Sequence, residues 1–446
     1  MKGLLKVDQS TLRPGRIDIS GYRHSSNLIL ISTLLMPEVE ATIENIPLVS
    51  DTEVIVSILR GLGAKVEFDR AARTVVVNTS SAQNLPVDPG DSSRLHGSMY
   101  LMPALVSRFG SGSFVASGGC QIGSTDDSRS RPHEHVLSVM QAFGVAITKT
   151  GQEGVAKDYA FRLDGKREGV TIDIDDYLFW DGQNEGSLTS GATKTALLLA
   201  LASSEGITTI LNPFLKSEVV DLIDFFRSCG VDMDCDEEKI VVRKRDLKPA
   251  VVHEVISDPS EIVTYACLAA YHEVELVLGN VSTDRTVPIL APEFGVLETM
   301  GVSISVDGDC IGVSPTRDLR PIDIEVTPRG VCTDHHPLLL SLMSKAGGTS
   351  TLVDKVWPER FLYAHQLQKI GLELSRENNK ITVVGKPPSR ADDVLFCDDL
   401  RAAALIIILA IKTPGPTLIA GFEHVYRGYP GFFENLRRLG ARVEHA

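Results

Sequence analysis

The residue in this chain best suited to chemistry is a cysteine in an unusual loop. Cys120 lies in the stretch VASGGCQIGSTDDSRSRPHEH, residues 115–135, with glycines on both sides and small polar residues after it. This composition predicts a mobile surface loop. Arginines downstream would favour the thiolate form of the sulfur, which sets Cys120 apart as a candidate reactive thiol. Taken alone, an ordinary loop cysteine is still the simpler interpretation.

A scatter of arginines is the second candidate group. They fall at expected helix starts and in loops, at Arg23, Arg131, Arg360, Arg401 and Arg427. Guanidinium groups bind carboxylates and phosphates through paired, charge-assisted hydrogen bonds, so a cluster of them would suit a substrate with several negative charges. Each arginine would equally suit a carboxylate within the fold, and the residue types alone do not choose between these roles.

Common nucleotide and metal motifs are missing. The stretch SGATKT, residues 190–195, lacks the glycine spacing of a phosphate-binding loop, and no G-x-G-x-x-G follows an expected strand. The pairs His133/His135 and His335/His336 do not make a convincing zinc set, and a surface or supporting role is favoured for them. The sequence therefore predicts neither a metal site nor a bound cofactor.

A sequence unit that is repeated six times along the chain must position these residues. A hydrophobic-Gly-small-x-apolar string recurs with its glycine at positions 63, 144, 230, 301, 371 and 440. Finding such a repeat matters because a unit of fixed content says how the chain builds its core.

Each unit is expected to contain the same parts. A helix with hardly any polar face comes first, as is typical of a helix buried all round. The six expected ranges are 25–35, 98–109, 193–203, 261–271, 337–345 and 400–412. A β-like run, an amphipathic helix ending at the repeated glycine as a C-terminal cap, and often two short alternating strands complete the unit.

The repeat predicts an α/β protein with two domains of three units each, helices inside and sheets outside. The break is expected around residues 245–257. The strand RIDIS, residues 16–20, precedes the first unit and is expected to complete the C-terminal domain. The predicted lobes are therefore 21–256 and 1–20 plus 257–446, joined by two crossings, with ligands bound in the cleft between them.

Bulk properties limit the partners. The 446 residues carry a net charge of −14, which argues against a nucleic-acid or anionic-membrane surface. The first residues, MKGLLKVDQS, lack the apolar segment of a signal peptide, and the longest apolar run, 402–411, is too short to span a bilayer. Seven cysteines without a C-x-x-C pair are typical of reduced thiols. A cytoplasmic enzyme is expected, and its oligomeric state is left open.

The whole chain resembles the enolpyruvyl transferases, most closely those of the MurA type. The family's GGCAIG loop matches residues 118–123, around Cys120, and its following arginine-proline matches Arg131-Pro132 after an apparent six-residue insertion near 124–130. Four further motifs follow in the family's order, at Cys332-Thr333-Asp334, Pro358-Glu359-Arg360-Phe361, Asp399-Leu400-Arg401-Ala402-Ala403 and Tyr426-Arg427-Gly428-Tyr429.

The resemblance implies the fold and the reaction. The fold would be a two-domain inside-out α/β barrel of six βαβαββ-type units with a double hinge. The reaction would transfer an enolpyruvyl group from phosphoenolpyruvate, a co-substrate, to an acceptor hydroxyl with release of phosphate. By analogy Cys120 is the general acid and Asp334 the base, although Asp334 would also serve as a helix N-cap. The implied substrate-binding residues are Arg23, His24, His96, Arg131, Pro132, Glu134, Thr189, Gly191, Arg360, Arg401 and Arg427.

Departures from the family pattern fall at the acceptor side. The family's S-G-A-K-N reads Ser20-Gly21-Tyr22-Arg23-His24, and its M-R-A-S reads Leu95-His96-Gly97-Ser98. Arginine does not replace lysine neutrally. The simplest inference is that the reaction is kept and the acceptor altered. A uridine nucleotide is expected, either UDP-N-acetylglucosamine or UMP, the latter as in nikkomycin- and polyoxin-type nucleoside antibiotic pathways.

Two alternatives are weaker. A binding or regulatory protein without turnover would explain the departures, but Cys120, Asp334 and four arginines are retained. Shikimate 3-phosphate as acceptor is suggested by the stretch HSSN, residues 24–27, but the arginine expected after it is Leu28 and the cysteine loop points elsewhere.

Overall fold

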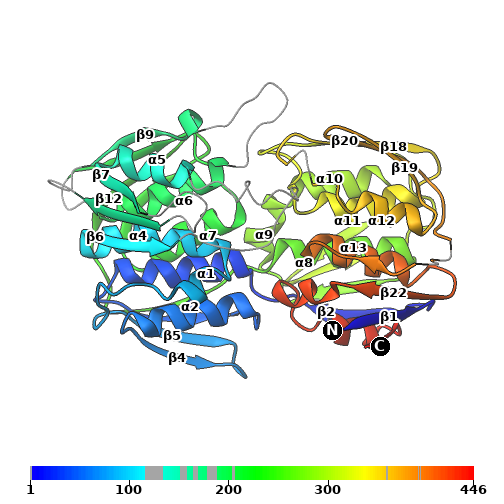
Figure 1. Ribbon diagram of the computed structural model, residues 1–446, viewed down its shortest axis with the longest axis horizontal. Coiled ribbons are helices and arrows are strands. Elements are labelled where there is room, and N and C mark those ends of the chain that lie inside the picture. Colours follow the sequence, from blue (N-terminus) through cyan, green and yellow to red (C-terminus); the bar gives the residue numbers. More distant parts are fainter. Residues whose placement is uncertain are drawn as a thin grey trace.

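The computed structural model consists of two lobes lying side by side, each with helices inside and sheets outside (Figure 1). It describes residues 3–115, 134–150, 158–163, 169–177, 188–202, 206–357, 360–389, 391 and 393–445. Within these residues the sheets number six, five of four strands and one of three. The inside-out α/β barrel with repeated units, predicted from the sequence, is confirmed.

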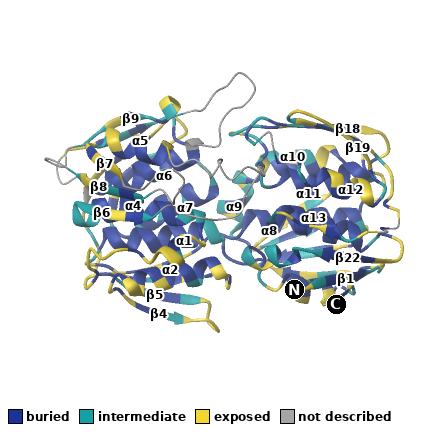
Figure 2. Ribbon diagram, viewed as in Figure 1, coloured by how far each residue is buried: buried dark blue, intermediate teal, exposed yellow. Residues whose placement is uncertain are grey.

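The six inner helices form where the sequence shows unbroken apolar runs. They are α1 (Arg23–Ser32), α4 (Leu101–Phe109), α6 (Leu188–Ala200), α8 (Pro259–His272), α11 (His336–Lys345) and α13 (Leu400–Ala410), with 3₁₀ turns η1 (Thr33–Leu35) and η2 (His96–Tyr100) beside α1 and α4. Every residue of α13 is buried, and the inner helices form the dark centre of each lobe in Figure 2. Because a buried leucine or isoleucine contributes about 1.5–3 kcal/mol, these helices fix the two cores.

A second helix in each unit ends just before the repeated glycine. These helices are α2 (Ser50–Gly61), α5 (Glu134–Ala142), α7 (Ser217–Ser228), α10 (Ala291–Thr299), α12 (Ala364–Lys369) and α14 (Phe432–Arg438). All six glycines have φ between 78° and 98°. The expected C-terminal caps are therefore confirmed, since only glycine adopts this left-handed conformation without strain. Shorter helices are α3 (Pro89–Ser92), α9 (Thr283–Ile289), η3 (Ile174–Tyr177) and η4 (Phe422–Arg427).

Three sheets cover the lobe that contains α1. Their strand orders are β13 (Ala250–Glu254), β3 (Glu40–Glu44), β5 (Thr74–Asn78), β4 (Lys65–Asp69); then β6 (Ser111–Val115), β8 (Asp158–Leu163), β7 (Val145–Thr150); and β11 (Val231–Cys235), β12 (Lys239–Arg245), β10 (Thr208–Leu211), β9 (Thr171–Asp173).

Three more sheets cover the lobe that contains α8. Their orders are β15 (Ile304–Asp307), β16 (Cys310–Val313), β14 (Leu276–Gly279), β2 (Gly15–Asp18); then β17 (Asp323–Val326), β18 (Thr349–Asp354), β20 (Lys380–Val384), β19 (Glu373–Glu377); and β21 (Leu395–Phe396), β22 (Pro416–Ala420), β1 (Leu4–Asp8), β23 (Arg442–His445).

The lobes are joined because two units exchange their edge strands. In three units, the strands before and after the inner helix pair in parallel with each other. An example is β17 and β18, which α11 connects. The strand before α1, β2, instead pairs in parallel with β14, and the strand before α8, β13, pairs in parallel with β3. The N-terminal strand thus completes the C-terminal half, as the sequence predicts, and the chain crosses between the halves twice.

The buried side chains fall into two clusters that follow the same division. One cluster draws on residues 28–255, and the other on residues 5–19 together with 262–443. The exact lobe limits of 21–256 and 1–20 plus 257–446 stay a prediction. Among the described residues, no helix combines the length and apolar character needed to cross a membrane.

Candidate active site

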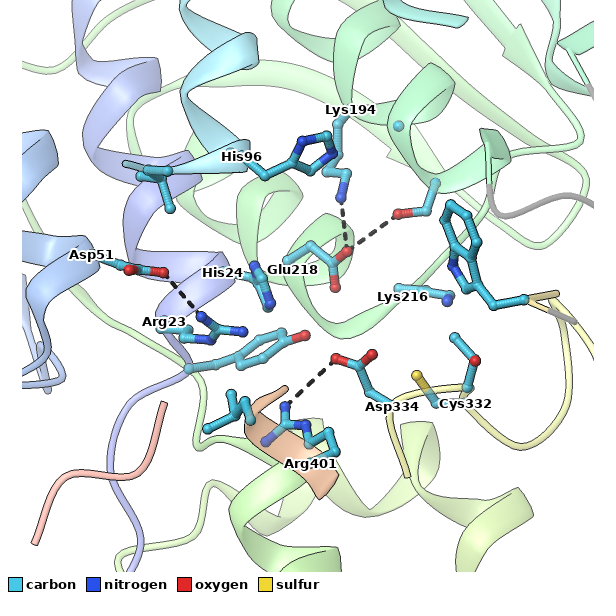
Figure 3. A pocket seen from close by; sticks show the side chains of 18 of the residues that line it. Arg23, His24, Asp51, His96, Lys194, Lys216, Glu218, Cys332, Asp334 and Arg401 are labelled. Carbon is cyan, nitrogen blue, oxygen red and sulfur yellow. Dashed lines mark hydrogen bonds and ion pairs between the residues drawn. The ribbon is translucent and has the colours of Figure 1, made fainter. Parts of the chain in front are cut away.

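A cavity of about 250 Å³ lies between the two lobes and collects charged side chains from both (Figure 3). From the first lobe come Arg23 and His24 at the start of α1, His96 at the start of η2, and Gly191 in α6. The opposite wall carries Asp334, Arg360, Arg401 and Arg427. Eight of the predicted site residues, spread over four hundred positions of sequence, therefore meet in one cleft.

Asp334 and two arginines form the central ion cluster of this cavity. The Asp334 carboxylate lies 2.6 Å from Arg360 Nη1 and 3.6 Å from Arg401 Nη2. Its side chain is 27% exposed, whereas those of Arg360 and Arg401 are almost completely buried. Burial acts to raise the pKa of Asp334, but the two guanidinium groups hold that pKa well below its usual range. Asp334 is therefore an ionised carboxylate facing the cavity.

The N-cap alternative for Asp334 is not what the structure shows. The N-cap of α11 is His335, and the backbone of Asp334 lies one residue earlier in the preceding turn. Its carboxylate accepts a hydrogen bond from Arg360 instead. The side chain is thus directed to the cleft rather than to the helix end.

Arg401 is placed to receive an anion. It follows Asp399, whose side chain caps α13 by accepting from the backbone N–H groups of Arg401 and Ala402. Its guanidinium lies over the Tyr429 ring, 5.1 Å from the centroid, and is 2% exposed. Apart from the ion pair with Asp334 and the contact with Tyr429, its three side-chain nitrogens have no well-aligned hydrogen-bond partner among the described residues. Since unsatisfied buried donors are costly, this arrangement favours a bound carboxylate or phosphate.

A second acid–arginine cluster crosses between the lobes. Asp51 of α2 pairs with Arg23 at 2.9 Å and with Arg427 of η4 at 3.6 Å. Arg23 also donates to the backbone oxygen of Arg427. Arg23 and Asp51 belong to one lobe and Arg427 to the other, so this cluster connects the two walls of the cleft at the cavity edge.

A buried lysine and glutamate form a third charged pair, which sequence reasoning missed. Lys194 Nζ lies 2.9 Å from Glu218 Oε1, which also accepts from Ser190 Oγ. Burial opposes the charge on Glu218, but Lys194 and Lys216 lower its pKa to about 2. Lys194 stands in SGATKT, the stretch that resembles a phosphate loop only superficially. Lys194 is the only charged residue of α6, whose other residues are apolar, small or hydroxylated, and this was the signal that could have found it.

The neighbouring predicted residues are packed closely. Burial and the adjacent Arg23 hold the pKa of His24 well below its usual range, so its imidazole is neutral at pH 7. A Cβ at Gly191 would lie 2.1 Å from Nε2 of the buried His135, so only glycine allows this approach of α6 to α5. Tyr22, Lys216, Cys332 and Trp357 also line the cavity without having been predicted as site residues.

Several predicted residues are not brought to the cavity by the described structure. Cys120, Arg131 and Pro132 lie outside the described residues, and for Thr189 only the backbone, in α6, is described. Glu134 begins α5 with an exposed side chain and does not line the cavity. The roles assigned to these five residues stay predictions.

The described cysteines and histidines point to no further chemistry of their own. Six described cysteines are free thiols, and burial raises the pKa of Cys332, which lines the cavity, to about 11. His335 and His336, expected at the surface or in a supporting role, are buried against Glu293 and Asp354. No cluster of three or more His, Cys, Asp or Glu side chains in the described ranges is arranged to hold a metal ion.

Comparisons with known proteins agree with this geometry. The EPSP synthase (3-phosphoshikimate 1-carboxyvinyltransferase) family profile matches residues 7–436. The crystal structure of the enolpyruvyl transferase NikO from Streptomyces tendae superposes with a TM-score of 0.88 and 31% identity, covering 100% of this chain and 99% of that one. A UDP-N-acetylglucosamine 1-carboxyvinyltransferase from Wolbachia pipientis subsp. Culex pipiens (strain wPip) is 29% identical over 437 residues, 96% of each chain. EPSP synthase from Acinetobacter baumannii shares the fold, with a TM-score of 0.75 at 19% identity.

The fold and the cleft define an enzyme of the carboxyvinyl (enolpyruvyl) transferase class. The chain belongs to the EPSP synthase family, and within it to the MurA-like enolpyruvyl transferases that the sequence motifs predict.

Proposed function

We propose that this enzyme transfers the enolpyruvyl group of phosphoenolpyruvate to a sugar hydroxyl of a uridine nucleotide and releases phosphate. The observation that carries the proposal is the buried Arg360–Asp334–Arg401 cluster, in which a carboxylate and two guanidinium groups face one cavity. Phosphoenolpyruvate brings a carboxylate and a phosphate, and the guanidinium groups are suited to both.

The chemistry assigns a separate task to each residue. A proton is added to the methylene carbon of phosphoenolpyruvate, which makes C2 electrophilic, and Cys120 is proposed as its donor. The acceptor hydroxyl attacks C2 and gives its proton to Asp334, forming a tetrahedral adduct. Loss of phosphate from C2 and of a proton from the methyl group then restores the double bond. The products are the enolpyruvyl ether and inorganic phosphate.

Substrate binding would itself prepare Asp334 as a base. Burial acts to raise the pKa of Asp334, but Arg360 and Arg401 hold that pKa well below its usual range, which makes the carboxylate a weak proton acceptor. When the anionic substrate shares those guanidinium groups, the attraction on Asp334 is divided and its pKa rises toward the range of an effective base. The same charges that bind phosphoenolpyruvate would thus activate the carboxylate only when the substrate is present.

UMP and UDP-N-acetylglucosamine are the two proposed acceptors. The relatives named UDP-N-acetylglucosamine 1-carboxyvinyltransferases support the latter. The specific observation in favour of UMP is the altered acceptor side, with Arg23, His24 and His96 lining the cavity where the family pattern has lysine, asparagine and arginine. Neither a metal nor a bound cofactor is required by the proposed steps, and a cytoplasmic location stays a prediction.

The test is phosphate release by the purified enzyme with phosphoenolpyruvate and, separately, UMP, UDP-N-acetylglucosamine or shikimate 3-phosphate. Release with one uridine nucleotide, and a carboxyvinyl adduct of that nucleotide by mass spectrometry, is expected. Release only with shikimate 3-phosphate would overturn the proposed acceptor. No release with any of the three would instead favour a binding protein without turnover.

Two pairs of variants test the proposed residues in the same assay. Asp334→Asn should lower kcat by about 10²–10⁴-fold, the usual contribution of a positioned base, while Asp307→Asn on exposed β15 should not. Cys120→Ala should abolish or severely slow turnover, while Cys235→Ala, at the end of β11, should not. Equal effects within either pair would contradict that assignment.

A further inference from the structure

The turn that carries Asp334 is held on both sides by buried carboxylates. Glu293 of α10 accepts hydrogen bonds from the backbone N–H of Cys332 and from His335 Nδ1, both at 2.8 Å. Asp354, the last residue of β18, accepts from Thr333 Oγ1 at 2.6 Å. Every residue flanking Asp334 in this turn is therefore tied down, while the Asp334 side chain faces the arginines.

Asp354 is shared between this turn and the segment that leads to Arg360. Its Oδ1 accepts from the backbone N–H groups of Val356 and Trp357, at 2.7 and 2.9 Å. Its Oδ2 takes the Thr333 hydroxyl and lies 3.1 Å from His336 Nε2. One carboxylate thus joins two loops, and those loops supply the two partners of the Asp334–Arg360 ion pair.

The setting of Asp354 makes these bonds strong. Asp354 and His336 are both fully buried. The His336 ring packs against the Phe361 ring, with 5.2 Å between the ring centroids. Although burial acts to raise it, the pKa of Asp354 is lowered by His336 and by the hydrogen bonds from Thr333 and Trp357. A buried carboxylate with its acceptor sites in use fixes its donors in place, because losing any of them leaves an uncompensated charge.

We infer that Asp354 is a positioning residue for the transfer reaction: through Thr333 and the backbone of Val356 and Trp357, it fixes Asp334 in register with Arg360. This inference rests on the proposed function, because Asp334 must be the base for its register to control the rate. Asp354 does not line the cavity, whereas its partners Thr333, Val356 and Trp357 do, so its effect reaches the chemistry through the position of those partners. A misplacement of about 1 Å in such a constellation costs on the order of 10²-fold in rate.

Two substitutions separate this role from a general contribution to folding. Asp354→Asn keeps the size of the side chain and removes its charge. Thr333→Val removes one hydroxyl at constant shape, and Thr333→Ser restores it. We expect Asp354→Asn to lower kcat about 10–100-fold and Thr333→Val about 10-fold, each with the KM for phosphoenolpyruvate changed less than about 3-fold. Thr333→Ser should recover most of the rate.

Thr351→Val is the matched control, because it removes a Thr–Asp hydrogen bond at another position of β18, the strand that ends with Asp354. Thr351 Oγ1 donates to Asp323 Oδ1 at 2.6 Å in an exposed part of β18, away from the cavity. This variant should leave kcat and KM unchanged. A double-mutant cycle completes the test: in the Asp334→Asn background, Thr333→Val should cause no further loss of kcat.

The outcomes that overturn the inference are distinct from failure of the proposed function. Thr333→Val and Asp354→Asn proteins that melt at lower temperature but keep wild-type kcat would show a structural role only, as would additive losses in the cycle. If the wild-type enzyme releases no phosphate with any acceptor, the proposed function fails. In that case, crystal structures of the Asp354→Asn and Thr333→Val variants are the test. If the distance from Asp334 Oδ1 to Arg360 Nη1 stays at 2.6 Å in both variants, the positioning role is overturned.

Discussion

At the scale of single residues, the site depends on the shape of its cations as well as on their charge. Arg360 and Arg401 are almost completely buried and approach the same carboxylate, Arg360 from a turn and Arg401 from the first turn of α13. A guanidinium presents a rigid planar set of donors, whereas an ammonium is a compact point charge on a flexible chain. The side-chain nitrogens of Arg401 are therefore directional donors at the cavity wall.

Replacing Arg401 with lysine tests this directional requirement. Arg401→Lys keeps the charge but loses the paired donors, so we expect the KM for phosphoenolpyruvate to rise about 10–100-fold, with a smaller loss in kcat. Steady-state kinetics measure both, and Arg317→Lys, at an exposed position, is the control. A KM equal to that of the wild type would mean that Arg401 contributes only charge to the site.

At the scale of elements, the two crossings between the lobes form one hydrogen-bonded joint. Gly21 and Ser257 make an antiparallel bridge, and Tyr22 N–H and Asp258 N–H donate across it to Ile256 and Ser20. Asn45 and Asn280 lie beside this joint, and both have positive φ. Their side-chain amides donate to the backbone oxygens of Val255 and Ile19, one in each crossing segment. This joint places α1 and α8, and with them the two walls of the cleft.

Gly21→Ala should disturb that joint strongly. A Cβ at Gly21 would lie 1.7 Å from the backbone oxygen of Asn45, which no side-chain movement can relieve. We expect a loss of about 1–3 kcal/mol in the free energy of unfolding, with reduced kcat because the lobes are displaced. Denaturant unfolding and phosphate release measure the two effects.

Gly61→Ala is the control for this substitution. A Cβ there meets nothing within 4 Å at the end of α2, so its effect should be neutral or slightly stabilising. Equal stability of the two variants would contradict the tight joint.

At the scale of the whole molecule, buried charges connect the lobes. Asp221 of α7 accepts from Arg285 of α9 at 3.0 Å and from the Ile256 N–H at 3.1 Å, and also contacts Ser25 and His253. On the other side of the crossing, Glu261 of α8 accepts from the Ser20 N–H and hydroxyl. Buried carboxylates therefore hold both the Asp221–Arg285 contact between the lobes and the segment that crosses before α1.

Glu261 should make stability depend on pH. Burial, with the nearby Asp258, raises the pKa of Glu261 from 4.5 to about 8. Between these two values the folded protein holds a proton that the unfolded chain has lost, so this group's contribution to stability is complete below about pH 4.5 and is lost as the pH rises through 8. The expected slope is up to roughly 1.4 kcal/mol per pH unit.

Glu261→Gln should flatten this dependence, because glutamine does not titrate but still accepts from Ser20. The variant and the wild type should be similarly stable at pH 5, and the variant should be more stable at pH 8. Thermal unfolding across this range measures the difference, with Glu275→Gln, at an exposed position, as the control. Parallel pH profiles for wild type and Glu261→Gln would contradict the raised pKa.

The sequence by itself determined the repeat, the fold class and eight of the residues that line the cleft. Apolar helices with no polar face can only be buried, and a glycine after each second helix indicates the left-handed cap that the structure contains. Arg360, Arg401 and Asp334 were identifiable only because the short motifs around them match, in order, those of the enolpyruvyl transferases. These signals are local or periodic, and a single chain displays them without any tertiary information.

Only the tertiary structure decided which charges meet. Asp51, Lys194, Glu218 and Asp354 stand in ordinary helix or strand contexts, and nothing near them in sequence indicates their partners. Their roles arise where segments far apart in the chain come together at the cleft. The exchange of β2 and β13 between the lobes sets that meeting point, because strand pairing over more than two hundred residues is fixed by packing and not by local pattern.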